Sequence, residues 1–111
     1  MIQLTQTQVN EIVQEAMQEA RTAAERALAQ YGDRDACGFA WTNIYNVKGN
    51  TKLGKMLKAA GVRQDYTKAF QIWNPSGLYV QNVDTLEAGA RAAAEVFQLA
   101  GFEAYAGSRL D

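Results

Sequence analysis

The first part of the chain carries one apolar stripe with helical spacing. After Val9, apolar residues recur at steps of one, three and four, the pattern of an amphipathic helix. Thr5 and Gln8 have the spacing of a capping box, in which each side chain satisfies the other residue's free backbone N–H. Gly32 supplies a left-handed stop. The pattern predicts a helix over residues 6–31, which would run about 39 Å and lie across the whole domain or overhang it.

The remainder of the chain alternates between strand-like and helix-like patterns. Four segments are predicted to be strands, the first of them from its aromatic-rich alternation of period two. They cover residues 37–45, 69–74, 78–83 and 102–107. Asn74-Pro75-Ser76-Gly77 is a strong turn signal, which predicts a hairpin between the second and third of these strands.

Two further helices are indicated between the strands. A short one follows Asn50 or Thr51 as its cap and stops at Gly61. A longer one begins at Asp84, which forms a D-x-x-E capping box, and ends at Gly101.

After the first helix, the order is strand, helix, strand, strand, helix, strand, which is the split βαβ or ferredoxin-like arrangement. Right-handed crossovers place both later helices on one face of the sheet. We therefore expect a single α+β domain over residues 1–111, with a long N-terminal helix and link over residues 1–35. Residues 36–111 would form a ferredoxin-like βαββαβ core with a four-stranded antiparallel sheet. Many unrelated functions use this fold, so the fold alone does not assign one.

Strand parity separates two faces of the predicted sheet. The helix-covered face collects aliphatic and small residues and phenylalanine: Ala40, Ile44, Phe70, Ile72, Leu78, Val80, Phe102 and Ala104. The opposite face collects aromatic rings, amides and one carboxylate: Phe39, Trp41, Asn43, Tyr45, Gln71, Trp73, Tyr79, Gln81, Glu103 and Tyr105. A simple solvent face does not need both tryptophans, so we expect something to cover it.

Three covers are compatible with this pattern and with one another. The N-terminal helix has a matching apolar stripe and could fold back over the sheet. A second subunit could pack there. The third cover is a flat ligand, such as a base stacked on Trp41 or Trp73, a contact worth about 1–3 kcal/mol per base.

Composition narrows the chemistry. The 111 residues include no histidine and one cysteine, which leaves almost no ligands for zinc or haem and no Cys–His pair for catalysis. We therefore expect no catalytic residues, no metal and no cofactor, and we interpret Cys37 as a small buried hydrophobic residue. The chain shows no signal-peptide pattern and no transmembrane window, which favours a cytoplasmic location without membrane binding.

Charge is uneven along the chain, although the formal net charge is only −1. That small net charge argues against a protein that coats nucleic acid, although it does not exclude RNA binding. Residues 48–68 hold six basic residues against one acidic residue. Lys52, Lys55 and Lys58 follow one helix face, which is either a solvated face or an electrostatic footprint for phosphate. Ser108 and Arg109 near the end of the chain offer a hydroxyl and a guanidinium for the same purpose, or form an ordinary chain end.

Two resemblances follow from these segments. The topology is similar to that of the RNA-recognition motif, which stacks bases on sheet aromatics, although residues 78–83 lack the motif's K/R-G-F-G-F-V-x-F pattern. Four segments resemble small uncharacterised proteins encoded by tailed bacteriophages: CGFAW (37–41), QIWNPSG (71–77), EAGA (87–90) and AYAGSRLD (104–111). The phage resemblance implies a host-takeover or anti-defence factor in the host cytoplasm, a class that includes proteins that sequester nucleotide signals.

The leading hypothesis is a non-enzymatic, self-associating protein that holds a phosphorylated small ligand such as a nucleotide. The ring-stacking and phosphate-binding candidates are Phe39, Trp41, Trp73, Asn74, Ser76, Tyr105, Ser108, Arg109, Lys52 and Lys55. The alternative is an inhibitor that binds a host enzyme through the long helix or the aromatic face. A small enzyme acting on a nucleotide is a third hypothesis.

Overall fold

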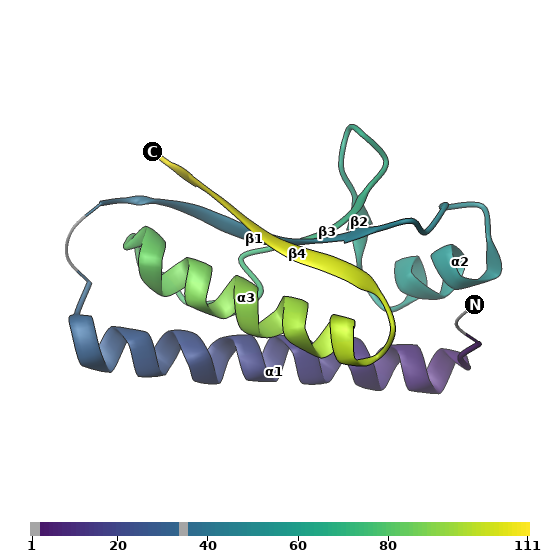
Figure 1. Ribbon diagram of the computed structural model, residues 1–111, viewed down its shortest axis with the longest axis horizontal. Helices are drawn as coiled ribbons and strands as arrows, with labels where there is room; N and C mark the ends of the chain where they lie inside the picture. The colour runs from purple at the N-terminus through teal and green to yellow at the C-terminus, as the bar shows by residue number, and fades with distance from the viewer. Residues whose placement is uncertain (1–2, 34–35) are drawn as a thin grey trace.

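The computed structural model, which describes residues 3–33 and 36–111, contains a long helix, a sheet and two further helices (Figure 1). The elements are α1 (Gln6–Tyr31), β1 (Gly38–Tyr45), α2 (Lys52–Ala59), β2 (Arg63–Gln64), β3 (Phe70–Trp73), α3 (Val83–Leu99) and β4 (Glu103–Leu110). The four strands have the order β2-β3-β1-β4, and every neighbouring pair is antiparallel.

The connections match the expected α+β fold. The segment containing α2 joins β1 to β2, with β3 lying between those strands, and the segment containing α3 joins β3 to β4 around β1. Each crossover is therefore a split βαβ unit. The predicted fold class, a long N-terminal helix followed by a four-stranded antiparallel sheet with further helices, is confirmed.

One predicted strand is wrong. Residues 78–82 form no strand, and their only ladder contact is the isolated bridge between Cys37 and Asn82. Within the turn that precedes them, the side chain of Ser76 donates to Asn74 Oδ1 at 3.0 Å, and the backbone N–H of Leu78 donates back to Ser76 Oγ at 3.3 Å. Ser76 is buried, so the turn carries the chain down toward the helices instead of back along β3. On its side away from β1, β3 pairs with the two-residue strand β2, which the sequence pattern did not indicate.

The start of α3 also differs from its prediction. Asn82, not Asp84, is the N-cap, and its side-chain oxygen accepts the backbone N–H of Thr85 at 2.9 Å. Asp84 lies in the first turn, where a carboxylate interacts favourably with the helix dipole. Asn82 and Asp84 are both favourable N-cap residues, and the local sequence alone does not show which of them caps the helix.

Helix α1 has the predicted bounds and spans the longest dimension of the molecule, which is 42 Å. The Thr5–Gln8 capping box is present, and Gly32 ends the helix with a φ of 77°. The helix lies along α3, on the same side of the sheet as α2 and α3 (Figure 1). It therefore does not fold over the aromatic side of the sheet, which was one of the three expected covers.

Small residues allow α1 and α3 to approach closely. Helix α1 buries Ala16, Ala20 and Ala24, and α3 places Gly89 directly against Ala20 and Ala24. A Cβ added at Gly89 would lie 3.0 Å from the carbonyl oxygen of Ala20. The larger core side chains gather instead between the helices and the sheet, where Phe70, Phe97, Ile44 and Leu57 are fully buried.

An aspartate organises the loop between β2 and β3. Asp65 Oδ1 accepts the hydroxyl of Thr67 at 2.6 Å and the backbone N–H groups of Thr67 at 2.8 Å and Ala69 at 3.1 Å. The Thr67 hydroxyl is the main cause that lowers the pKa of Asp65 below its usual value.

This loop gives a pH-dependent prediction. Because the folded pKa of Asp65 is lowered, its contribution to the free energy of unfolding is present above the usual aspartate pKa and is lost as the pH falls through the lowered value. We expect Asp65→Asn to cost at most about 1 kcal/mol at pH 7, since the group is partly exposed, and the difference from the parent to vanish in acid. Urea unfolding at several pH values measures it, and a difference independent of pH would contradict this role.

Candidate functional site

The side of the sheet away from the helices is uncovered in the part of the chain that the structure describes. Along β1, residues alternate between buried and half-buried or exposed, and the antiparallel registers bring rings and polar groups together on the open side. We call this surface the aromatic face; it consists of Phe39, Trp41, Asn43, Tyr45, Gln71, Trp73, Glu103, Tyr105, Gly107 and Arg109. The predicted composition of this surface holds for the residues in β1, β3 and β4. It is wrong for Tyr79 and Gln81, because their segment is not a strand.

Two tryptophans form the centre of the aromatic face. Trp41 and Trp73 are register partners on neighbouring strands, and their rings lie parallel within 6° with centroids 5.3 Å apart. This is the offset-stacked geometry that aromatic pairs prefer. The indole of Trp73 remains 50% exposed, so one ring of the pair is available to a further partner.

Gly107 on β4 provides the space in which the Trp41 indole lies. A Cβ at this position would be 2.4 Å from Trp41 Nε1 and 2.6 Å from Cε2. Any side chain at residue 107 would therefore displace the indole from β4. The position of the tryptophan pair depends on this glycine.

A phenylalanine and an arginine extend the cluster along β1 and β4. The ring of Phe39 lies 5.7 Å from that of Trp73 at an angle of 36°, and the guanidinium carbon of Arg109 lies 5.3 Å from the Phe39 centroid. The second distance is within the range of a cation–π contact. Arg109 makes no salt bridge to a described residue, so its N–H groups are available to an anion.

A second pair of rings lies at the other end of the aromatic face. Tyr45 and Tyr105 have centroids 6.1 Å apart at an angle of 42°. Between them and the tryptophans, Gln71 Nε2 donates to Asn43 Oδ1 at 3.2 Å. Tyr105 therefore shares the face with the tryptophans but belongs to a separate cluster.

The structure places Ser108 away from Arg109. Successive residues of a strand point to opposite faces, and the Ser108 hydroxyl donates to Glu87 on α3. Glu87 also pairs with Arg91 on the same helix. The predicted joint cradle of serine and arginine is therefore split between the two sides of the sheet.

The other candidate polar residues also lie away from the tryptophan pair. The side chain of Asn74 donates to the Leu78 carbonyl at 3.0 Å and accepts from Ser76, so both groups serve the turn. Lys52 and Lys55 are exposed on α2, which packs on the helix side of the sheet. The structure thus brings together four of the predicted site residues: Phe39, Trp41, Trp73 and Arg109.

The prediction for the single cysteine is wrong. Cys37 is exposed, and its thiol donates to Gln81 Oε1 at 3.6 Å. It precedes the first residue of β1, outside the ladder that buries alternate residues of that strand.

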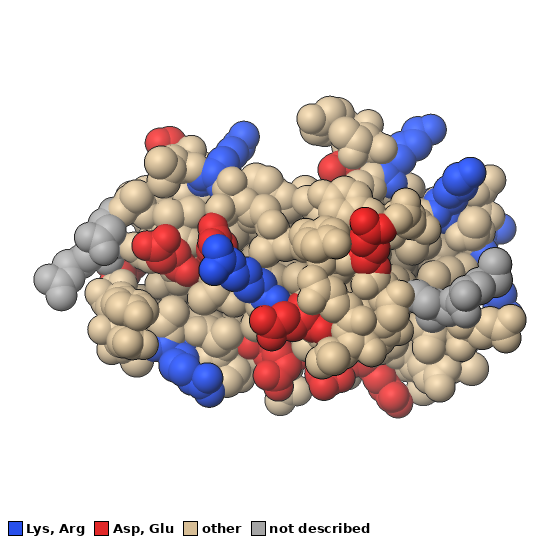
Figure 2. Space-filling model, in the orientation of Figure 1, with Lys and Arg blue, Asp and Glu red and all other residues tan. Residues whose placement is uncertain are grey.

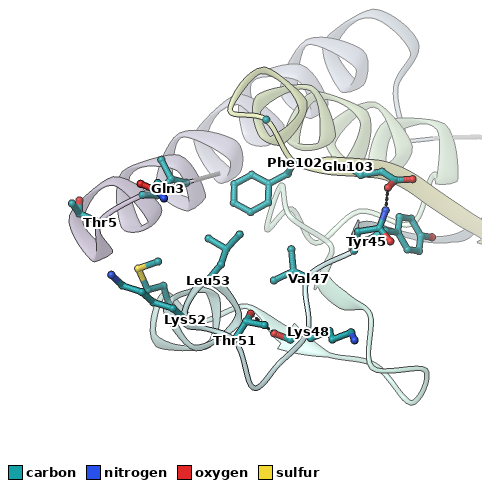
Figure 3. Close-up of a pocket in the computed structure, with 14 residues that line it drawn as sticks. Gln3, Thr5, Tyr45, Val47, Lys48, Thr51, Lys52, Leu53, Phe102 and Glu103 are labelled. Carbon is teal, nitrogen blue, oxygen red and sulfur yellow. Dashed lines mark hydrogen bonds between the residues drawn. The ribbon is translucent and has the colours of Figure 1, made fainter. Parts of the chain in front are cut away.

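The structure contains a cavity at the Tyr45 end of β1 that the sequence analysis did not predict (Figure 3). Its volume is about 960 Å³, and its walls come from the segment before α1, the loop after β1, α2 and the turn before β4. These segments are distant in sequence, so no local motif could reveal the cavity. Of the predicted site residues, Lys52 lines it.

Among the described residues, no group of three or more His, Cys, Asp or Glu side chains could hold a metal ion, and no helix is long and apolar enough to cross a membrane. The resemblance to tailed-phage proteins and the host setting that it implies stay predictions. Comparison with protein-family models, with curated proteins and with solved structures finds no match for this chain.

Proposed function

We propose that this chain is a non-enzymatic binding protein that holds a phosphorylated small ligand with a flat ring, a nucleotide or a nucleotide-derived signal, on the aromatic face. The observation that carries the proposal is the stacked Trp41–Trp73 pair with its outer indole half exposed. The hydrophobic core lies between the sheet and the helices, so the fold does not need two tryptophans on the opposite side of the sheet.

The tryptophan pair suits the ring of such a ligand. A base stacked on an aromatic side chain contributes about 1–3 kcal/mol. Strand β2 pairs with β3 only at Phe70 and Gln71, so within the described chain no strand flanks Trp73 on its outer side. A third ring can therefore continue the stack at Trp73.

The arginines suit the phosphate. Arg109 lies next to Phe39 on the same face, across β1 from Trp73. Arg63 is exposed and pairs with Gln71 in the register of β2 and β3, which adds a second cation at the sheet edge. A guanidinium binds phosphate through two parallel N–H···O bonds. If the chain acts in a phage-infected cell, holding such a ligand would withdraw a nucleotide signal from host defence.

Tryptophan fluorescence tests the proposal directly. The protein is titrated with AMP, ATP, cyclic mono- and dinucleotides and a short single-stranded RNA, with adenosine and inorganic phosphate as matched controls. We expect saturable quenching by one phosphorylated compound at one site per chain, and weaker binding of its nucleoside. Binding of the RNA alone, with steep salt dependence, would make the protein a nucleic-acid binder instead. No quenching by any compound would contradict the proposal.

The second candidate function is binding of a protein on the same surface. Tyr45, Trp73 and Tyr105 expose 38%, 50% and 53% of their area, and a contiguous patch of exposed rings also marks protein interfaces. The occupant is then a host enzyme that the chain inhibits, or a second copy of the chain. Sedimentation velocity distinguishes self-association, and a stoichiometric band retained from host lysate distinguishes a host enzyme.

A further inference from the structure

The cavity at the Tyr45 end of β1 has an apolar interior. In Figure 3, the side chains of Leu53, Val47 and Phe102 point toward the same space. Leu4 and Met56 complete the apolar part of the lining. Phe102 and Met56 belong to the buried core, whereas the other three pack against it and are only partly buried. At this end the hydrophobic core is thus covered only by side chains that are themselves partly exposed. The volume of about 960 Å³ is within the range of small-molecule sites.

Cationic side chains lie at the edge of this apolar space. Lys48 and Lys52 line the cavity, and Figure 3 shows their ammonium groups at opposite ends of its edge, both pointing away from the apolar side chains. Both lysines are exposed and form no salt bridge with a described residue. Among the described residues that line the cavity, Glu103 alone is acidic, and its carboxylate accepts from Asn46 Nδ2. The edge is therefore favourable for an anion.

The surrounding surface reinforces this charge. Residues 48–68 contain six basic residues and one acidic residue. On the side shown in Figure 2, basic side chains gather at the end of the molecule where α2 lies, whereas acidic side chains gather along α1. An anion approaching the cavity meets a positive region before it reaches the two lysines, which raises its local concentration.

The wall that carries Lys48 is held against α2. The Lys48 carbonyl accepts the Thr51 hydroxyl at 2.6 Å, and Lys58 Nζ donates to the Gly49 carbonyl at 3.1 Å. A Cβ on Gly54 would lie 2.1 Å from the Lys48 carbonyl oxygen, so the loop and the helix are in direct backbone contact. A wall fixed in this way keeps the site formed before a ligand arrives, which reduces the ordering cost of binding.

We propose that this cavity is a second binding site, which takes a single-chain carboxylic acid of medium length. The alkyl chain lies against Leu53, Val47 and Phe102, and the carboxylate at the edge pairs with one of the two lysines, Lys48 or Lys52. This site is separate from the aromatic face, and the inference does not depend on the proposed nucleotide function. The apolar interior favours an alkyl chain over a sugar or a nucleotide, and the lysines favour an acid over an alcohol or an amine.

The test uses the full-length ¹⁵N-labelled protein and three probes with the same alkyl chain: decanoate, decanol and decyltrimethylammonium. We expect decanoate to shift the amide signals of residues 47–53 and 102 in a saturable way and to leave the indole N–H signals of Trp41 and Trp73 in place. Decanol is expected to bind about five-fold more weakly, since it lacks the ion pair, and the ammonium probe more weakly still. The unmoved indole signals separate this site from the aromatic face.

Lysine variants provide the matched control. The double variant Lys48→Ala/Lys52→Ala is expected to weaken decanoate binding by about five-fold or more. Lys55→Ala, which changes a lysine on the same helix as Lys52 but outside the lining, is expected to leave the binding unchanged. All three side chains are exposed, so the fold is retained. Equal binding of the three probes, equal effects of the double variant and Lys55→Ala, or binding only to phosphatidylglycerol vesicles and not to free decanoate would each overturn the proposal.

Discussion

Replacing Trp73 with alanine is expected to weaken nucleotide binding by about ten- to a hundred-fold, the range that corresponds to the loss of one base–aromatic stack. Trp73 is 50% exposed, and its main ring contacts are Trp41 and Phe39. The variant should therefore keep its free energy of unfolding to within about 1.5 kcal/mol of the parent, the value of an aromatic pair. Isothermal titration calorimetry measures the affinity without relying on the removed fluorophore.

Tyr79→Ala is the matched control for this variant. Tyr79 is a fully exposed ring in the segment between the turn and α3, and it does not lie on the aromatic face. Its removal should leave both affinity and stability unchanged. Unchanged affinity in Trp73→Ala, with binding still present in the parent, would place the ligand elsewhere on the molecule.

The largest expected loss of stability is that of Phe97→Ala. Phe97 is completely buried and meets the ring of Phe102 edge-on at 5.7 Å, within a cluster that includes residues from α1, β1 and α2. Truncating a buried phenylalanine to alanine costs about 3–5 kcal/mol through lost transfer energy and the cavity left behind. Small domains have only about 5–15 kcal/mol in total, so this variant should unfold at a much lower urea concentration.

Leu99→Ala is the control for Phe97→Ala, because it also truncates a large apolar side chain to alanine in α3, but at an exposed position. Leu99 is 90% exposed two residues after Phe97, so its truncation should change the free energy of unfolding by no more than about 0.5 kcal/mol. Urea titrations with an unchanged slope give both values. A cost below about 1 kcal/mol for Phe97→Ala would contradict the position of the core between α1, α3 and the sheet.

Local signals predicted the parts of the fold that depend on nearby residues. The capping box at Thr5 and Gln8 and the stop at Gly32 define both ends of α1, and the structure has the same bounds. The alternation in residues 38–45 correctly separated the buried side of β1 from its open side. The strand predicted for residues 78–83 does not form, because the preceding turn, in which Ser76 is buried, leads the chain away from the sheet.

The sequence predicted which residues share the aromatic face but not how their side chains contact one another. Parity put Trp41 and Trp73 on one side, whereas their direct stacking depends on the register of two neighbouring strands that lie far apart in sequence. The same parity, applied to Ser108 and Arg109 as neighbours, would have shown that they cannot share one phosphate. The cavity beside Lys52 was unpredictable, because its walls come from separate parts of the chain whose packing no local pattern encodes.

Because α1 packs along α3, the residues that stabilise the fold lie on the helix side of the sheet, and the exposed rings lie on the opposite side. Since the helices fill one side of the sheet without help from the other, rings on the aromatic face can be exchanged while the interior stays intact. Related chains could then keep this architecture and change what they bind through a few substitutions in β1, β3 and β4. Among such chains, ligand specificity would diverge faster than the fold. The small residues where α1 and α3 pack closely would change most slowly.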